Sequence, residues 1–336
     1  MLRFAVHRVL AMVGILWALL TIVFVLRTVI PSNPARTMAG PGATPALIAV
    51  ERARLGLDKP LAVQYANYLS GAVRGNLGIS VYTRNPVSAD LARAIPASVE
   101  LLAGAVVVMI VLGLALGLLG GSAVRGSGVL RVVMVSGASV PTFLLGLLGL
   151  LLLYGRLHIA PPGGEVSGTI GAPTGPTGIV ILDGLLAGRL DVVTDGLWHL
   201  ALPAFVLGIG PALIIGRTLQ SSLRTVSGQD YIRTARAKAL PGWAVLLRHA
   251  LRNALNAPLS LTGLEICGML AGIAVVEDVF SWPGLGLYTV HAITTSDFAA
   301  IAGVTLVIGA GYVIMNAIID VAQVAADPRL RRRAPA

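Results

Sequence analysis

The sequence predicts an all-α polytopic membrane protein with six transmembrane helices. Of its 336 residues, 56% are hydrophobic and only 12% are charged, and the mean hydropathy is +0.84. A soluble domain of this size needs more charge to cover its surface. A helix needs about 20 apolar residues to cross a hydrocarbon layer of about 30 Å, and the chain contains six such runs. The segments between these runs also differ in charge, because basic residues are concentrated on one predicted side of the membrane and acidic residues on the other.

The six predicted spans are residues 9–30, 99–119, 132–154, 197–217, 258–276 and 299–319. Basic residues precede the first run, as they do in a signal peptide. However, its apolar stretch exceeds the roughly 7–15 residues of a signal-peptide core, and no small-residue cleavage site follows closely. We therefore expect an uncleaved first span.

Charge sets the expected orientation of the spans. With the N-terminus in the cytosol, 15 of the 25 basic residues fall on the cytosolic side, whereas 11 of the 15 acidic residues fall outside. Cytosolic loops of membrane proteins carry an excess of Lys and Arg. The sequence therefore predicts that both termini are cytosolic.

The domain boundaries follow from these spans. Residues 1–30 form the N-terminal segment with the first span, and residues 31–98 form an extracytoplasmic helical subdomain, because they contain helix-like pieces punctuated by prolines. Residues 99–322 form the main transmembrane domain, with a cytosolic loop at 220–257, and residues 323–336 form a basic tail. Residues 155–196 include a Pro/Gly-rich piece too irregular to cross lipid unprotected.

The loop from Asp230 to Pro258 is the most informative segment of the chain. Its Ala and Leu content favours helix, and five basic side chains are spread along it. The Pro241-Gly242 pair interrupts it. We therefore predict two short basic amphipathic helices with a hinge between them, presented for docking to a cytosolic partner.

Sequence motifs for catalysis are absent. The chain has no Gly-Lys pair for a phosphate-binding loop, no HExxH zinc site and no GxSxG nucleophile elbow. The single cysteine, Cys267, cannot form a disulfide within the chain. We therefore expect a non-catalytic subunit that binds no cofactor or metal.

Glycines recur at helical spacing inside two predicted spans. Gly113, Gly117 and Gly121 lie four residues apart in the second span, and Gly268 and Gly272 repeat this spacing in the fifth. Small residues at this interval allow close approach of two helices. Helix packing is the expected role, and lining of a pore is the alternative.

Three further residues inside the spans are candidates for the transport pathway or an interface. Pro203 and Pro211 should bend the fourth span. Glu265 places a carboxylate near the middle of the fifth span, which is costly unless it is paired, protonated or facing water. It faces a translocation cavity or a subunit interface, or else it is a protonated or hydrogen-bonded packing residue.

Several segments resemble one family. The loop RTARAKALPGWAVLLRHALRNAL resembles the EAA loop of type I ABC-importer permeases, in the form found in the dipeptide/oligopeptide group. LRTVIPSNPA, RARLGLDKPLAVQYANYL, GNLGISVYTRNPV, SVPTFLLG, HLALPAF and VVEDVFSWPGLG also match, in order and over nearly the whole chain. The resemblance implies the architecture of a type I ABC-importer permease.

The resemblance also implies partners. The chain would lie in a bacterial inner membrane and pair there with a homologous permease. It would bind two cytosolic ABC ATPase subunits that hold ATP and Mg, and it would receive substrate from an extracytoplasmic binding protein. Peptides are the implied substrate, and nickel, glutathione and haem are the alternatives within the group. An ATP-independent secondary transporter is a further alternative, although the chain lacks paired ionisable groups near the midplane.

Motif positions transfer onto specific residues of the loop. The implied coupling helix carries Asp230, Tyr231, Arg233, Ala235, Arg236, Lys238, Ala239 and Leu240. Ala239 stands where the family usually has glycine, so that a turn with positive φ would cost more here. The Pro241-Gly242 pair offers a turn downstream instead.

The resemblance also indicates an outer contact region. We expect it to touch the binding protein or to close the outer gate, and its candidate residues are Asn76, Tyr82, Trp282, Pro283 and Gly284.

Overall fold

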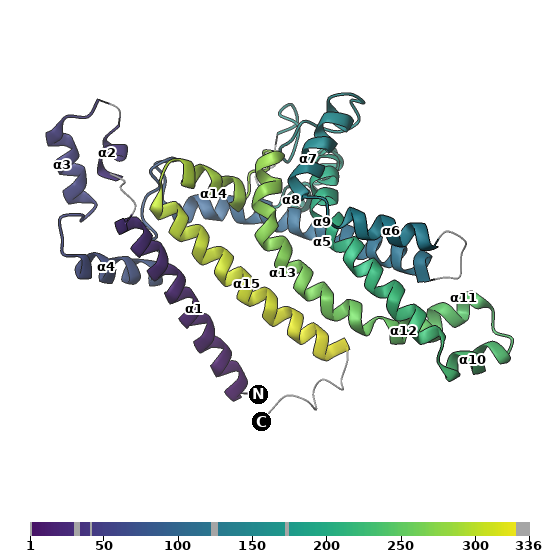
Figure 1. Cartoon of the computed structure of the whole chain (residues 1–336). Helices are drawn as coiled ribbons and strands as arrows, with labels where there is room; N and C mark the ends of the chain where they lie inside the picture. The colour runs from purple at the N-terminus through teal and green to yellow at the C-terminus, as the bar shows by residue number, and fades with distance from the viewer. Residues whose placement is uncertain (1, 30–33, 41, 122–126, 172–174, 327–336) are drawn as a thin grey trace. The chain divides into compact units, whose positions relative to one another are not determined.

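The computed structural model describes residues 2–29, 34–40, 42–121, 127–171 and 175–326. Across these ranges the chain is nearly all helical, and its only β feature is an isolated bridge between Ile79 and Pro86. The helices, shown in Figure 1, are α1 (Leu2–Val29), α2 (Pro34–Ala39), α3 (Pro45–Arg54), α4 (Leu61–Val73), α5 (Val87–Gly121), α6 (Ser127–Gly137), α7 (Thr142–Gly149), η1 (Leu150–Tyr154), α8 (Val180–Leu186), α9 (Leu190–Ser227), α10 (Asp230–Ala237), α11 (Gly242–Ala244), η2 (Val245–Ala250), α12 (Leu251–Ala254), α13 (Asn256–Val279), α14 (Leu285–Thr294) and α15 (Phe298–Ala326). The all-α prediction is confirmed.

Among the residues that the structure describes, five helices are long and apolar enough to cross a membrane. They comprise Leu10–Val29, Val87–Gly121, Leu190–Ser227, Asn256–Val279 and Phe298–Ile319. Each contains most or all of one predicted span. Two of them begin well before the predicted spans, α5 by twelve residues and α9 by seven, because their first turns contain polar residues and escape a search for apolar runs.

The third predicted span, 132–154, differs from the others. The structure interrupts it between α6 and α7, where Val140 bonds back to Gly137 in a tight turn. Pro141, the residue before α7, then has an extended backbone with ψ of 135°, which separates α7 from α6. The prediction of one continuous helix is therefore wrong here. The apolar helix that remains in this stretch, Thr142–Tyr154, is shorter than a membrane span. A membrane crossing by residues 132–154, which would bring the total to six, therefore stays a prediction.

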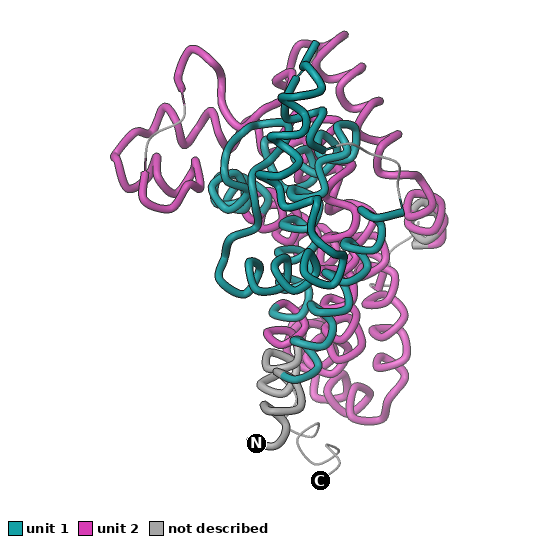
Figure 2. Tube along the Cα trace, turned by 90° about the vertical axis from the view of Figure 1, so that its left-hand side faces the viewer, with its two compact units in different colours: residues 1–98, 283–314 teal, residues 99–282, 315–336 magenta. Residues whose placement is uncertain are grey.

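The chain divides into two compact units, coloured separately in Figure 2. Unit 1 consists of residues 1–98 and 283–314, and unit 2 of residues 99–282 and 315–336. The two helices predicted within 31–98 are present as α3 and α4. Unit 1 joins them to α1, α14 and the first part of α15, so a subdomain confined to residues 31–98 stays a prediction.

Unit 1 has its own apolar core where the start of α5 meets α14 and α15. Its buried members are Val87, Leu91, Ala94, Leu285 and Val304. A Cβ on Gly303 of α15 would lie 2.5 Å from the Val87 side chain, so glycine is what permits this contact. The first turns of α5 are therefore packed, not loose.

In unit 2 the glycines of α5 pack against α9. An added Cβ would lie 2.6 Å from Leu219 at Gly117 and 2.6 Å from Leu223 at Gly121. Such separations are shorter than carbon atoms tolerate, so these glycines set the distance between the two helices. Packing is the role that the structure assigns to this stripe.

The glycines of α13 behave differently. A Cβ on Gly268 would meet nothing within 4 Å, and one on Gly272 would only touch Leu207 at 3.9 Å. This face of α13 is therefore open in the single chain.

Candidate functional site

The segment that follows α9 folds as two helical pieces joined by a short turn. The first piece is α10, and the second runs from α11 through η2 to α12 without a gap. The turn covers residues 238–241 and ends at Pro241, whose ψ of 144° is extended. The predicted pair of helices with a hinge near Pro241-Gly242 matches this arrangement.

A small apolar cluster fixes both pieces to the end of α9. Ile232 is fully buried and Ala235 nearly so, three residues apart on one face of α10. The other buried members are Leu219, Leu223, Val245, Ala250 and Ala254. Burial of one Ile side chain stabilises a contact by roughly 1.5–3 kcal/mol. The segment is therefore attached to α9 as a rigid extension, and Ala235 is part of that attachment.

One hydrogen bond joins the two pieces directly. Nδ2 of Asn253 in α12 donates to the phenol oxygen of Tyr231 in α10 over 2.9 Å. A second polar pair stays within α10, where Arg233 lies 3.4 Å from Asp230 with both side chains highly exposed. An ion pair this exposed contributes little to stability. Arg233 and Asp230 are therefore accessible to a partner.

The remaining predicted residues, Arg236, Lys238, Ala239 and Leu240, are all exposed. Ala239 has φ of +57°, in the left-handed region. The turn is thus located at Ala239 itself and has not moved downstream to Gly242, whose φ is not positive. For a residue with a Cβ, this conformation costs roughly 1–2 kcal/mol relative to the right-handed one.

A hollow of about 700 Å³ lies between these elements. Arg236 lines it together with Arg224 at the end of α9 and Trp243 of α11. The Trp243 side chain is 70% exposed. Trp243 and Arg224 were not among the residues predicted from the sequence, although a tryptophan inside a basic loop was a visible signal. The hollow combines an exposed aromatic side chain with two guanidinium groups, and these residue types are enriched at protein–protein contacts.

Glu265 lies on α13, half-buried. Among the described residues it has no hydrogen-bond or ion-pair partner. It shares a helical face with Gly268 and Gly272, because these positions lie three and seven residues further on. That face has open space beside it, as described above. Its role as a pathway or interface residue stays a prediction.

Pro203 and Pro211 both lie inside α9, which continues through them as one 38-residue helix. Pro203 is buried and Pro211 is half-buried. Their predicted role beside the pathway stays a prediction.

The outer candidates are split between the two units. In unit 1, Asn76 and Tyr82 are exposed, and the Tyr82 ring stacks on His291 with centroids 5.1 Å apart. Pro283 is exposed and Gly284 is buried. In unit 2, the Trp282 side chain is buried, with 1% of the residue exposed, and its backbone N–H donates to the backbone carbonyl of Glu277 over 2.8 Å. The roles predicted for Trp282, Pro283 and Gly284 at the outer gate or the binding protein stay predictions.

A buried carboxylate organises the Tyr82 turn, and sequence analysis missed it. Oδ2 of Asp297 accepts hydrogen bonds from the Ser80 hydroxyl and the Val81 N–H, both over 2.6 Å. Its Oδ1 accepts from the N–H of Ala300 in the first turn of α15. An Asp directly before a helix is the expected sequence signal for such a cap. The Asp297 carboxylate therefore fixes the turn that carries Tyr82 to the start of α15.

A second carboxylate group holds the long loop of unit 2. Glu100 of α5 accepts from the N–H groups of Val180 and Ile181 at the start of α8, over 3.3 and 2.9 Å. Glu165 lies in the loop before α8, and burial, together with the charges of Glu100 and Glu277, raises its pKa from 4.5 to about 7. This loop thus carries an acid that titrates near neutral pH.

Within the described part of the chain, no three His, Cys, Asp or Glu side chains are grouped as they would be around a metal ion.

Comparison with known proteins adds three relatives over nearly the full length. The chain is 39% identical over 315 residues to the "Probable D,D-dipeptide transport system permease protein DdpB" of Escherichia coli (strain K12), covering 93% of this chain and 92% of that protein. It is 33% identical to the dipeptide transport system permease protein DppB of the same strain, covering 99% and 100%. It is 34% identical to the di/tripeptide transport system permease protein DppB of Pseudomonas aeruginosa (strain UCBPP-PA14), covering 99% and 100%.

Two family descriptions cover the chain as well. Residues 1–103 match the N-terminal region of binding-protein-dependent transport system membrane components, and residues 109–332 match the binding-protein-dependent transport system inner membrane component itself. The first match contains α1 to α4, and the second contains the attached segment from α10 to α12. The chain therefore belongs to the family of binding-protein-dependent transport system inner membrane components.

Proposed function

We propose that this chain is the permease subunit of an ATP-driven importer that moves dipeptides or other short peptides across the bacterial cytoplasmic membrane. The relatives named for dipeptide and di/tripeptide transport support the substrate class, because they align over at least 92% of both chains. The five long apolar helices support the membrane location.

The proposed complex contains four further chains. A homologous permease completes the pathway, two cytosolic ATPase subunits hold ATP and Mg, and an extracytoplasmic binding protein delivers the peptide. Both termini of this chain face the cytosol in this proposal, and the distribution of basic residues supports that orientation. The division into residues 1–30, 31–98, 99–322 and 323–336 is part of the proposal, although residues 327–336 of the tail lie outside the described residues.

The observation that carries the proposal is the attached segment from α10 to α12. One face is buried against α9, whereas the other presents basic and large apolar side chains to its surroundings. The exposed large apolar residues are Tyr231, Leu240, Trp243 and Leu247. An exposed apolar patch flanked by cations is typical of a protein-binding surface. A segment docked on an ATPase and rigidly attached to a span can transmit movement to the membrane helices.

Charge reversal at Arg236 and Lys238 tests this coupling role. The double variant Arg236→Glu, Lys238→Glu should lower peptide-stimulated ATPase activity and uptake at least about tenfold in the reconstituted complex, because like charges across an interface cost several kcal/mol. Membrane insertion should be unchanged. ATP hydrolysis and uptake are measured on the same proteoliposomes.

The double variant Arg248→Glu, Arg252→Glu is the matched control. It removes the same number of positive charges from η2 and α12, where both residues are exposed. If the basic residues serve only to orient the chain, both double variants should behave alike. Wild-type activity of the Arg236→Glu, Lys238→Glu variant would reject α10 as the coupling helix.

Two further assignments belong to this proposal. The Glu265 face of α13 contributes to the pathway or to the contact with the sister permease, and the open space beside Gly268 supports this. Tyr82 and Asn76 contribute to the contact with the binding protein, and their exposure supports this. Glu265→Gln should alter uptake or assembly, and crosslinking from positions 76 and 82 should capture the binding protein.

An ATP-independent secondary transporter is the competing function. It leaves the exposed face of α10 without a partner. Affinity purification of the tagged chain from its native membrane separates the two: an importer permease brings an ATPase pair and a second permease with it, whereas a secondary transporter transports its solute alone.

A further inference from the structure

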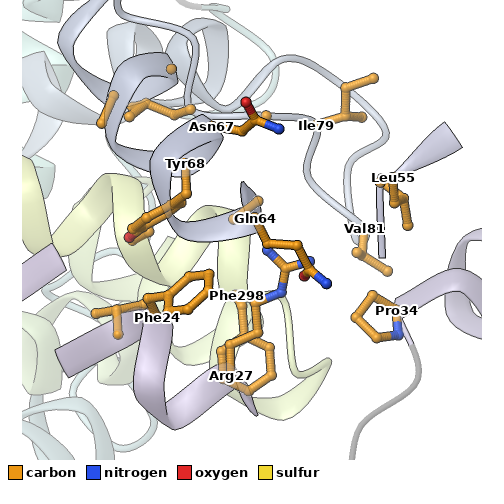
Figure 3. Close-up of a pocket in the computed structure, with 18 of the residues that line it drawn as sticks. Phe24, Arg27, Pro34, Leu55, Gln64, Asn67, Tyr68, Ile79, Val81 and Phe298 are labelled. Atoms are coloured by element: carbon orange, nitrogen blue, oxygen red, sulfur yellow. The ribbon is translucent and has the colours of Figure 1, made fainter. Parts of the chain in front are cut away.

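A cavity of about 290 Å³ lies inside unit 1, away from the α10–α12 segment. Its wall is formed by the last turns of α1, by α2, by α4 and by the start of α15. Figure 3 shows Arg27 and Phe24 of α1, Tyr68 and Gln64 of α4 and Phe298 of α15 around it. Ligand pockets in proteins begin at roughly 300 Å³. The cavity is therefore large enough for a small ligand group and too small for a folded partner.

The charge of the cavity is unbalanced. Arg27 is half-buried and is the only charged residue among those described in the lining, which contains no carboxylate. Across the described residues, Arg27 has neither a hydrogen bond nor an ion pair. A guanidinium group has five N–H donors and is the side chain best suited to phosphate and carboxylate. The positive charge of Arg27 therefore favours binding of an anion in the cavity.

Tyr68 of α4 is a second hydrogen-bond donor in the lining of the cavity. The hydroxyl of Tyr68 is buried and has no hydrogen-bond partner within the described part of the chain. Burial raises the pKa of Tyr68 to about 12, although the Arg27 charge opposes this shift, so the hydroxyl keeps its proton at neutral pH. An unpaired buried hydroxyl costs free energy until it finds an acceptor. An anion beside Arg27 would supply both groups with a partner.

The location of Arg27 indicates the source of the anion. It belongs to the last turn of α1, whose segment Leu10–Val29 is a candidate membrane span. Side chains beside it on α1 are exposed and apolar, with Val25 at 49%, Leu26 at 45% and Val29 at 71%. An Arg at the end of such a span lies at the depth of the lipid headgroups, where phosphates are abundant. The cavity thus adjoins a surface that acyl chains can cover.

We propose that this cavity binds the phosphoglycerol headgroup of an anionic phospholipid, with the phosphate paired to Arg27 and hydrogen-bonded by Tyr68. Phe24 and Phe298 in the lining contact the apolar part of the lipid. A zwitterionic lipid fits less well, because its ammonium group finds no carboxylate in the lining. The lipid headgroup would bridge helix α1, through Arg27, and helix α4, through Tyr68, and so stabilise unit 1.

Native mass spectrometry on the full-length protein, purified with its co-purifying subunits, tests the proposal. Delipidated protein is titrated with phosphatidylglycerol, phosphatidylcholine and inorganic phosphate in separate arms. We expect saturable binding of one phosphatidylglycerol, with phosphatidylcholine at least about tenfold weaker. Arg27→Gln should weaken phosphatidylglycerol binding about tenfold or more, since a hydrogen bond to a charged group is lost.

Matched variants separate the site from general charge effects. Arg74→Gln removes an exposed cation of the same unit outside the cavity and should bind as the wild type does. Tyr68→Phe and Arg27→Lys should give intermediate binding, and they preserve the test if Arg27→Gln fails to fold. Equal binding of both lipids, equal losses in Arg27→Gln and Arg74→Gln, or displacement of the lipid by millimolar inorganic phosphate would each overturn the proposal.

Discussion

Asn253 of α12 donates a hydrogen bond of 2.9 Å to the phenol oxygen of Tyr231 in α10. This contact closes the hinged segment across its turn, so that its two helical pieces hold a fixed angle. We expect Tyr231→Phe to shift the melting temperature very little, since both residues are exposed. Uptake per ATP hydrolysed should fall by about two- to fivefold, because a looser lever transmits less movement.

A double-mutant cycle checks this prediction. If the hydrogen bond is the cause, Asn253→Ala and Tyr231→Phe should have the same effect on the uptake-to-hydrolysis ratio, and the double variant should be no worse than either. Additive losses would mean that the two side chains act on separate partners.

Ala239 offers a substitution that should improve the turn. Its φ of +57° is strained for alanine but costs glycine little. We expect Ala239→Gly to stabilise the turn by about 1 kcal/mol, which slows hydrogen exchange of the amides at 236–240 about fivefold. Ala239→Val should do the opposite, because a β-branched side chain tolerates this region even less well. Unchanged exchange in both variants would show that the turn is not strained.

Glu165 makes the stability of the protein depend on pH. Its pKa is raised from 4.5 to about 7, first by burial and then by the charges of Glu100 and Glu277. The folded protein therefore holds this proton more tightly than the unfolded chain does, and the contribution of Glu165 to stability falls as pH rises from about 4.5 to about 7. The expected loss is about 1–3 kcal/mol.

Thermal unfolding of Glu165→Gln at pH 5 and pH 8 checks the sign. The variant should match the wild type at pH 5 and melt at a higher temperature at pH 8, because a neutral amide replaces the unfavourable carboxylate. Asp58→Asn, which removes an exposed carboxylate, serves as control and should show no such difference. A wild type that gains stability relative to Glu165→Gln at pH 8 would contradict the assignment.

Two glycine substitutions distinguish closed from open helix faces. Gly117→Ala places a methyl group 2.6 Å from Leu219 and should destabilise the packing of α5 on α9 by about 1–3 kcal/mol. Gly268→Ala meets open space and should leave stability unchanged or raise it. The melting temperature of the purified chain measures both.

A larger side chain then tests what covers α13. Gly268→Leu should fold in the single chain but reduce recovery of the sister permease on co-purification, provided that this face is the subunit contact. Full recovery with intact uptake would place the contact elsewhere.

Sequence hydropathy was sufficient to predict the long helices because each apolar run has about the 20 residues that cross the hydrocarbon layer. It failed at Pro141, where composition stays apolar although the backbone is extended and not helical. It also underestimated the length of α5, since its first turns are buried against Leu285 and Val304, which lie far along the chain. Such a contact has no local signal.

The hinged segment was predictable in outline because its turn is marked by Pro241 and its inner face by Ile232. The importance of Trp243 was not, since only the folded arrangement places it beside Arg224 and Arg236. The position of the turn was not predictable either. Composition favoured a turn at Gly242, whereas the residue with positive φ is Ala239.

The Asp297 carboxylate, bonded to Ser80 and Val81, also constrains the order of events during synthesis. Its partners leave the ribosome more than two hundred residues before it does, so the early portion of unit 1 must wait, incompletely assembled, until the last helix is made. A fragment that stops at residue 98 would lack this carboxylate and leave the Ser80 hydroxyl and the Val81 amide without their acceptor. A recombinant version of this region for binding studies would therefore have to include residues 283–314.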